Sequence, residues 1–169
     1  LILNTIADAD IEGSSLDSLQ EYLDQNVDAV VINRPERVAN TTRDRNATRL
    51  SGIDGLTFPR THRVRFENAK PDKVARMVGD LEFEYPFLIR RTGTQTGRSF
   101  ARIKTREDLD AYVGERLNST YFLIEYRKIL WKDKLFRKLR LFHIDGTFFP
   151  VVCHLDKMWN VHGGNRKTI

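Results

Sequence analysis

Residues 85–104 of the 169-residue chain read YPFLIRRTGTQTGRSFARIK. The apolar run 87–91 ends in two arginines, and the segment 99–104 alternates apolar with polar side chains. Alternation with a period of two is typical of a half-buried strand, so we predict two strands joined by a polar loop. Gly93 and Gly97 allow the loop backbone to approach a ligand and to turn N–H groups toward an anion.

The loop region also carries hydroxyl and cationic groups. Thr92, Thr94 and Thr96 add hydroxyl donors, while Arg90 and Arg91 point to opposite sides of the strand, so that one of them faces a given cleft. Donors at the tip and a cation at the base suit a cover over phosphates, but an ordinary solvated hairpin would have the same composition. The loop is not of the Walker A type, because it lacks the lysine and its spacing is one residue short.

The first 60 residues predict an α/β lobe. Residues 1–6 and 28–33 are apolar and are expected to form buried strands, and Ser15 is expected to cap a helix over 16–25 between them. A further helix is expected over 42–50, capped by a threonine. The strand–helix–strand order predicts a parallel, Rossmann-like sheet edge.

The rest of the chain predicts a mixed α+β body with antiparallel strands. Asp145-Gly146 is a strong hairpin signal between two alternating segments. Pro71 suits the first position of a helix that runs to about Leu81, and Thr105 is expected to cap another helix. The strands expected in this body cover 61–66, 87–91, 99–104, 121–126, 136–144 and 147–153.

Charge is distributed unevenly along the chain. The net charge is +5, but residues 1–36 hold eight acids and one base. The remainder holds 15 acids and 27 bases, a net charge of +12. A basic body indicates an anionic partner, and charge alone does not choose among nucleic acid, phospholipid head groups and a nucleoside triphosphate.

Composition also restricts the location of the protein. A single cysteine, Cys153, excludes an internal disulfide framework and fits a reducing compartment. No apolar run approaches the roughly 20 residues of a membrane span, and no basic-then-apolar leader opens the chain. We therefore expect a cytoplasmic protein with no membrane partner. Because the chain opens at Leu1 on a strand-like segment, we also expect that both ends of a longer protein are missing.

Two basic residues, Lys138 and Arg140, share one face of an expected strand. Contact with a phosphate or a substrate carboxylate and snorkelling to solvent at a sheet edge explain this pair equally well. His154, Trp159 and His162 are candidates for the border of an acceptor site, although a turn anchored by the packing of Trp159 explains them as well. The four histidines do not fall at zinc-ligand spacings, so no metal ligand is predicted.

The order of these segments resembles the ATP-grasp superfamily. The family typically shows a D-K helix, a G-I-P-x-P-x-T connection, a proline-led apolar strand ending in lysine before a glycine-rich loop, and an apolar strand ending in glutamate at the adenine hinge. The matching segments here are TRDR at 42–45, GI at 52–53 with FPRT at 58–61, YPFLIR at 85–90, and YFLIEY at 121–126. FRKLR at 136–140 and HLDKMWNVH at 154–162 are similar to a group of uncharacterised bacterial members. The wider likeness is to glutathione synthetase-like and ribosomal-protein glutamate ligase-like enzymes.

The resemblance implies a fold, a cofactor and a reaction. The end of a Rossmann-like pre-ATP-grasp lobe would occupy 1–60, and part of the ATP-binding body would occupy 61–169, with a small lobe over 61–120 and the start of a large lobe over 121–169. ATP would bind with Mg²⁺, whose ligands are expected outside this chain. An unknown carboxylate would attack the γ-phosphate to give an acylphosphate, which an amine or a thiol would capture. Relatives are often homodimers.

The resemblance also implies residue roles, carried over by position. The phosphate contacts would be Arg45, Arg90, Thr92, Gly93, Thr94, Gly97 and Arg98; the adenine contacts would be Leu123, Ile124, Glu125 and Tyr126; and Lys138 and Arg140 would supply catalytic charge. Both lysines of the family pattern are arginines here, which keeps the charge but changes its geometry. A nucleotide-binding module without ligase activity is therefore one alternative, and a basic nucleic-acid-binding domain is another.

Overall fold

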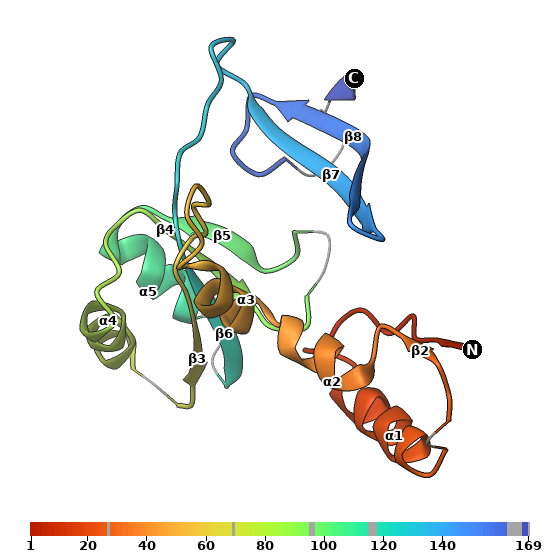
Figure 1. Ribbon diagram of the computed structural model, residues 1–169. Helices are drawn as coiled ribbons and strands as arrows, with labels where there is room; N and C mark the ends of the chain where they lie inside the picture. Colours follow the sequence, from red (N-terminus) through yellow and green to blue (C-terminus); the bar gives the residue numbers. More distant parts are fainter. Residues whose placement is uncertain (27, 69, 95–96, 115–117, 162–166, 169) are drawn as a thin grey trace. The chain divides into compact units, whose positions relative to one another are not determined.

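The computed structural model describes residues 1–26, 28–68, 70–94, 97–114, 118–161 and 167–168 (Figure 1). The chain divides into two compact units, Leu1–Tyr126 and Arg127–Ile169. The domain boundaries expected at residues 60 and 120 remain predictions. Among the described residues, no helix is long and apolar enough to cross a membrane.

The first unit begins with the predicted parallel pair of strands. β1 (Ile2–Leu3) pairs in parallel with β2 (Val31–Ile32), and α1 (Gly13–Asp24) connects them. This arrangement confirms the expected strand–helix–strand order. The expectation of buried strands is wrong in part, because Leu3 is 60% and Ile32 48% exposed. Strands of two residues present too little surface for other elements to cover.

The helix cap expected in this lobe is also corrected. α1 starts at Gly13 with Glu12 in the cap position, so Ser15 lies inside the first turn and its hydroxyl donates to Glu12 Oε2 at 3.0 Å. The helix expected over 42–50 is confirmed, with Thr42 in its cap position, but the expected capping is not, because the Thr42 side chain makes no capping hydrogen bond. The remaining helices of the lobe are α2 (Pro35–Val38), the 3₁₀ helix η1 (Ala39–Thr41) and α3 (Arg43–Leu50).

A four-stranded antiparallel sheet forms the rest of the first unit. Its strand order is β3-β6-β4-β5, and every neighbouring pair is antiparallel. The strands are β3 (Thr61–Phe66), β4 (Phe87–Arg91), β5 (Phe100–Ile103) and β6 (Ser119–Glu125). These strands and the β4–β5 hairpin confirm the sequence-based assignments, and together with the parallel pair they confirm the expected fold class of α/β followed by antiparallel α+β structure.

Two helices close one face of this sheet. α4 (Pro71–Asp80) has Pro71 in its first turn, as expected. α5 (Arg106–Gly114) is capped by Thr105, whose Oγ1 accepts the Asp108 N–H at 3.3 Å. Asp108 Oδ2 accepts the N–H of Lys104, the residue before the cap, at 2.9 Å, which further fixes the start of the helix.

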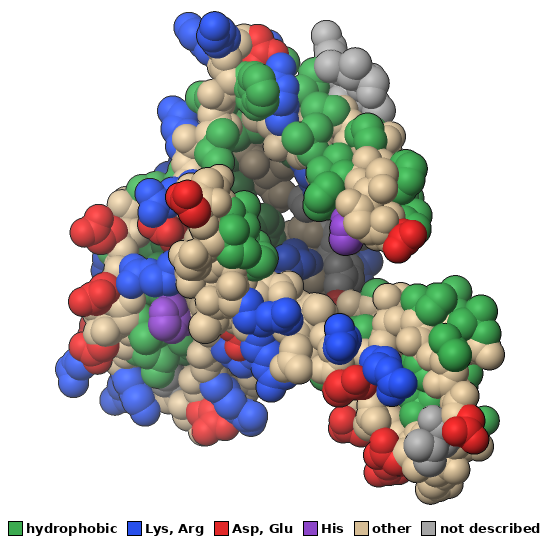
Figure 2. Space-filling view, viewed as in Figure 1, with side chains coloured by type: hydrophobic (Ala, Val, Ile, Leu, Met, Phe, Trp, Pro, Cys, Tyr) green, Lys and Arg blue, Asp and Glu red, His purple; other side chains and the backbone are tan. Residues whose placement is uncertain are grey.

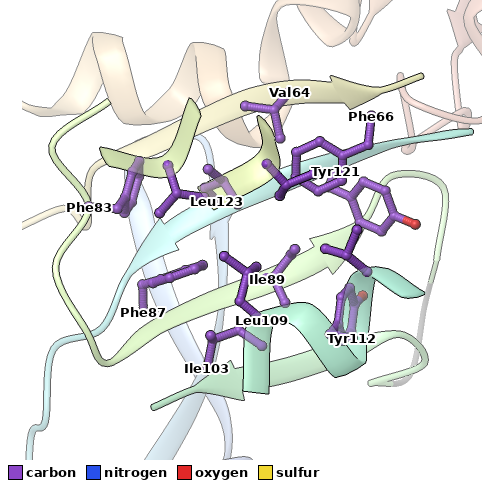
Figure 3. Close-up of a cluster of buried hydrophobic side chains, with 13 residues drawn as sticks. Val64, Phe66, Phe83, Phe87, Ile89, Ile103, Leu109, Tyr112, Tyr121 and Leu123 are labelled. Carbon is purple, nitrogen blue, oxygen red and sulfur yellow. The ribbon is translucent and has the colours of Figure 1, made fainter. Parts of the chain in front are cut away.

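The hydrophobic core lies between the sheet and these helices (Figure 3). The strands supply Val64, Phe66, Phe87, Ile89, Ile103, Tyr121 and Leu123, and the helices supply Val74, Val78, Leu109, Tyr112 and Val113. Leu123 was expected at the adenine pocket, and this expectation is wrong, because it is fully buried in the core. Its neighbour Ile124 points to the other face, since successive residues of a strand alternate.

The second unit is a long hairpin with a short third strand. β7 (Phe136–Ile144) pairs with β8 (Thr147–Asp156), and β8 pairs with β9 (Lys167–Thr168). The predicted turn is confirmed, with positive φ at both Asp145 (46°) and Gly146 (77°), as a tight hairpin requires. β8 is three residues longer than predicted, and a register shift at Arg140/Leu141 marks a β-bulge.

Candidate functional site

The face of the sheet opposite the core carries a row of alternating cations and aromatic rings. In the pairing register, Arg63 lies opposite Phe122, Phe122 opposite Arg90, and Arg90 opposite Phe100. The Arg63 guanidinium lies 4.7 Å from the centre of the Phe122 ring, and that of Arg90 lies 5.7 Å from the centre of the Phe100 ring. Both are cation–π distances. We call these four residues the arginine row and this side of the sheet the arginine face.

The arginine face becomes apolar toward the end of β6. Ile124 lies opposite both Thr61 and Leu88, and Leu88 lies opposite Arg102. The Arg102 guanidinium is hydrogen-bonded to Tyr126 beyond the end of β6, where Nη1 donates to the Tyr126 hydroxyl oxygen at 3.0 Å. Two aliphatic side chains at the centre therefore form a surface suited to a flat, uncharged ring.

The opposite end of the arginine face is polar and leads into the glycine loop. The N–H and hydroxyl of Thr92 both donate to the Thr120 carbonyl oxygen, at 2.9 and 3.2 Å, so this hydroxyl is already engaged. Gly93 and Gly97 have φ of 67° and 80°, which glycine adopts without strain. Arg98 is exposed beside the loop. Residues 95 and 96, including the predicted donor Thr96, lie outside the described residues.

Arg90 is the central cation of this site. Its residue is only 7% exposed, and its guanidinium donates to the carbonyl oxygen of Thr94 and lies 3.4 Å from the Thr94 hydroxyl. Burial lowers the pKa of Arg90, and the positive charge of Arg43 lowers it further, while Asp8 opposes both. Arg90 forms no salt bridge with any residue that the structure describes. A desolvated cation that lacks a carboxylate partner is a candidate for binding an anion.

Arg63 has the opposite character although it lies in the same row. Its Nε and Nη2 donate to both carboxylate oxygens of Asp44, at 2.9 and 2.8 Å, and Nη2 also reaches Asp10 Oδ1 at 2.7 Å. The Arg63 hydrogen bonds lower the pKa of Asp44 to about 2. Arg63 therefore fastens α3 and the loop before α1 to the sheet, and its charge is already neutralised.

Arg45 points away from this row. Its Nη1 donates to the Ala39 carbonyl oxygen at 2.9 Å and to Asn40 Oδ1 at 3.0 Å, next to η1. Arg43 is instead the α3 arginine whose charge acts on Arg90. Residues two apart on a helix lie roughly 200° apart around its axis, so Arg43 and Arg45 cannot serve the same face. The phosphate role of Arg45 stays a prediction. The sequence-based prediction missed Arg43, for which the available sequence signal was the apolar Ala47 one helical turn later.

Glu125 and Tyr126 lie where β6 ends. The Glu125 N–H donates to the Arg60 carbonyl oxygen at 2.8 Å, and Glu125 Oε2 accepts the Arg60 N–H at 3.3 Å. A pocket of about 640 Å³ opens at this end of the sheet, lined by Glu125, Tyr126, Arg60 and the segment that precedes β4. The expected adenine hinge is therefore next to a real cavity, although the Glu125 N–H is already engaged.

Lys138 and Arg140 belong to the second unit. Lys138 lies opposite His154 and Arg140 opposite Val152, so the basic pair shares one face of the hairpin with His154, as the register requires. Arg140 is exposed and Lys138 is half-buried. The turn after β8 is fixed by Asp156 Oδ1, which accepts the Met158 N–H at 2.8 Å. His162 lies outside the described residues.

A metal site is not evident in the part of the chain that the structure describes. No group of three or more histidine, cysteine, aspartate or glutamate residues there could hold a metal ion. The Mg²⁺ that the resemblance implies therefore finds no ligand set among these residues, and no chemical step is assigned to it.

Comparisons with known proteins match the chain to solved structures only. No family model matches the chain, and no curated protein matches it. A solved structure, D-alanyl-alanine synthetase A from Vibrio cholerae O1 biovar eltor str. N16961, is similar at 10% sequence identity and a TM-score of 0.47. The similar region covers 81% of this chain and 40% of that one, so the chain spans less than half of that protein's length. A similarity of this degree assigns no activity and no residue role.

Proposed function

We propose that this chain binds ATP and belongs to an ATP-dependent ligase of the ATP-grasp type, which joins a carboxylate to an amine or a thiol through an acylphosphate. The observation that supports the proposal most directly is the polarity of the arginine face. It runs from the aliphatic pair Leu88 and Ile124, through the buried Arg90, which forms no salt bridge with a described residue, to a glycine loop. A nucleotide has the same order of groups, with an apolar base at one end and a polyphosphate at the other.

The residues of the chain would act by positioning and by charge. The adenine ring would lie on Leu88 and Ile124, and its polar edge would meet the main chain at Glu125 and Tyr126. Phosphate oxygens would replace the Thr94 carbonyl oxygen as the hydrogen-bond acceptors of the Arg90 guanidinium. A phosphate group is a better partner for a buried cation than one carbonyl, because it is charged and can accept two hydrogen bonds at once. The glycine loop would then close over the phosphates and exclude water.

The proposed reaction has two steps. A carboxylate oxygen attacks the γ-phosphorus, the bond to the β–γ bridging oxygen breaks, and ADP leaves. An amine or thiol then attacks the acyl carbon, inorganic phosphate leaves with the carbon–oxygen bond electrons, and the nucleophile loses its proton to solvent. Lys138 and Arg140 are proposed to offset the negative charge that develops, a role in which fixed cations act mainly by electrostatic stabilisation.

Calorimetric titration of the full-length protein with MgATP tests this proposal. We expect micromolar binding that Arg90→Gln weakens at least about tenfold, because a charge-assisted bond to phosphate is lost. Arg76→Gln is the matched control, since Arg76 is an exposed arginine of α4, on the core side of the sheet. Arg90→Lys keeps the positive charge and serves as a second variant in case Arg90→Gln does not fold. Absence of ATP binding by a protein with an intact melting transition would overturn the proposal.

A second candidate is binding of single-stranded nucleic acid, which the basic body and the aromatic rings of the arginine row favour. Bases stack on exposed aromatic faces, however, and Phe122 is 1% exposed beneath Arg63. We therefore prefer the nucleotide. Displacement of bound ATP by a mixed oligonucleotide, with an affinity that falls steeply with salt, would instead favour nucleic acid.

A further inference from the structure

A separate cavity lies in the α/β lobe, at the carboxyl end of β2. It measures about 500 Å³ and is lined by Val31, Asn33, Arg34, Arg37, Val38 and Thr41. In sheets of parallel strands, ligands bind beyond the carboxyl ends of the strands, because the loops that follow converge there. The cavity occupies this position for the β1–β2 pair.

The charges around this cavity are unusual for their part of the chain. The first 42 residues contain eight acids and two bases, a net charge of −6, and the two bases are Arg34 and Arg37. Both line the cavity. Figure 2 shows acidic side chains gathered over the surface of the lobe that contains α1. Both basic side chains of the first 42 residues therefore lie at one cavity.

Neither guanidinium is used elsewhere in the described structure. Among the described residues, Arg34 and Arg37 form no ion pair and no side-chain hydrogen bond, whereas Arg63, Arg106 and Arg137 each pair with an aspartate. Arg34 is the N-cap residue of α2 and Arg37 lies three residues further on, and because both line the same cavity, one anion bound there can contact both side chains. Their position is consistent with binding an acid that comes from solution.

The backbone around the cavity is fixed by a reciprocal pair of asparagines. Asn4 Nδ2 donates to the Asn33 carbonyl oxygen at 2.8 Å, and Asn33 Nδ2 donates to the Asn4 carbonyl oxygen at 3.2 Å. Asn33 has φ of 59°, which turns the chain sharply from β2 into α2. Pro35 is buried at the start of α2 and limits the movement of its two neighbours. The arginines are therefore carried on a preorganised turn.

The remaining wall of the cavity defines the ligand. Val31 and Val38 are half-buried and contribute apolar surface, and the Thr41 hydroxyl donates to the Val38 carbonyl oxygen at 2.7 Å, which keeps its lone pairs available. We propose that this cavity binds a small aliphatic dicarboxylic acid, with its carboxylates on Arg34 and Arg37 and its carbon chain against Val31 and Val38. This site does not depend on the ATP site.

The test is a titration of the full-length protein with glutarate, followed by calorimetry and by the backbone amide shifts of residues 33–41. We expect saturable binding of one glutarate, weakened at least about tenfold by Arg34→Gln or by Arg37→Gln, because each loses a charge-assisted contact. Arg49→Gln is the matched control, since Arg49 is an exposed α3 arginine without a partner among the described residues. It should bind glutarate as the unaltered protein does.

Three outcomes would overturn the proposal. These are unchanged affinity in both cavity variants, an equal loss in Arg49→Gln, and no binding at millimolar glutarate. A parallel titration with inorganic phosphate separates the sources of the anion, because preference for phosphate with the same dependence on Arg34 and Arg37 would overturn the carboxylic acid assignment. ATP binding, measured on the same samples, should be unaffected by either cavity variant, so failure here and failure of the ATP site are distinguishable.

Discussion

The two faces of the four-stranded sheet are built from the same strands but differ in what covers them. On one face, Phe87, Ile89, Tyr121 and Leu123 are covered by α4 and α5. On the other face lie Arg90, Phe122 and Ile124, which are the next residues along the same strands. The core face buries an apolar cluster, whereas the arginine face buries Arg90, a cation that forms no salt bridge with any residue that the structure describes. The comparison indicates that stability is concentrated on the first face and binding on the second.

The largest expected effect is on the core face. Phe87→Ala should lower the free energy of unfolding by about 3–5 kcal/mol, because it removes a fully buried ring and leaves a cavity. Urea denaturation followed by circular dichroism measures this. Phe142→Ala, at a residue that is 56% exposed on β7, is the control and should cost about 0.5 kcal/mol or less. Equal losses in the two variants would mean that the core is misassigned.

The next effect concerns the clamp between α3 and the sheet. Asp44→Asn keeps the shape of the side chain but removes the charge that Arg63 binds through two hydrogen bonds, and it should cost about 1–2 kcal/mol. Asp72→Asn removes a more exposed pairing, with Arg106, and should cost about 0–1 kcal/mol. A smaller loss for Asp44→Asn than for Asp72→Asn would contradict the role given to Arg63.

The same pair predicts a pH dependence. The pKa of Asp44 is lowered from 3.8 to about 2 by Arg63, so the folded state favours the ionised carboxylate. This stabilisation is fully present above pH about 4 and is lost as the pH falls toward about 2, because the unfolded state takes up the proton first. The stability difference between the unaltered protein and Asp44→Asn should therefore shrink over that range. A constant difference would show that Asp44 does not titrate with folding.

A smaller effect is expected in the glycine loop. Gly93→Ala should cost about 1 kcal/mol, because φ of 67° strains a residue with a β-carbon. The added methyl group would itself meet only Ile11, at an ordinary 3.6 Å, so the cost arises in the backbone. Gly114→Ala is the control, since it lies at the end of α5 with no neighbour within 4 Å and should be neutral or slightly stabilising. Thermal unfolding of the two variants measures the contrast.

The smallest effect on stability is expected at Arg90. Arg90 is a buried cation that forms no salt bridge within the described part of the chain, so replacing it by leucine removes a desolvation cost, and Arg90→Leu should change stability by about 1 kcal/mol or less in either direction. The same variant should lose ATP binding. Loss of stability comparable to that of Phe87→Ala would place Arg90 among the structural residues and remove the distinction between the faces.

Much of the local structure follows from the sequence, because it depends on neighbouring residues. Alternation located β3 and β5, an apolar run located β4, the Asp145-Gly146 pair located the hairpin turn, and Thr105 located the start of α5. The glycine loop and the cation before it were also found in this way. The expected burial of Leu3 and Ile32 was wrong, because the burial of a strand depends on which other elements cover it.

The sequence by itself determined the order of strands and helices, the turn between β7 and β8, and the uneven distribution of charge. Only the tertiary structure decided that β6 lies between β3 and β4, and this pairing aligns Arg63, Phe122, Arg90 and Phe100 in one row. It also decided that Arg63 pairs with Asp44 and Asp10, whereas Arg90 forms no salt bridge with a described residue, and that Arg34 and Arg37 line one cavity. Strand register and ion pairing join residues that are far apart in the chain, so their outcome depends on the packed fold and cannot be obtained from local patterns.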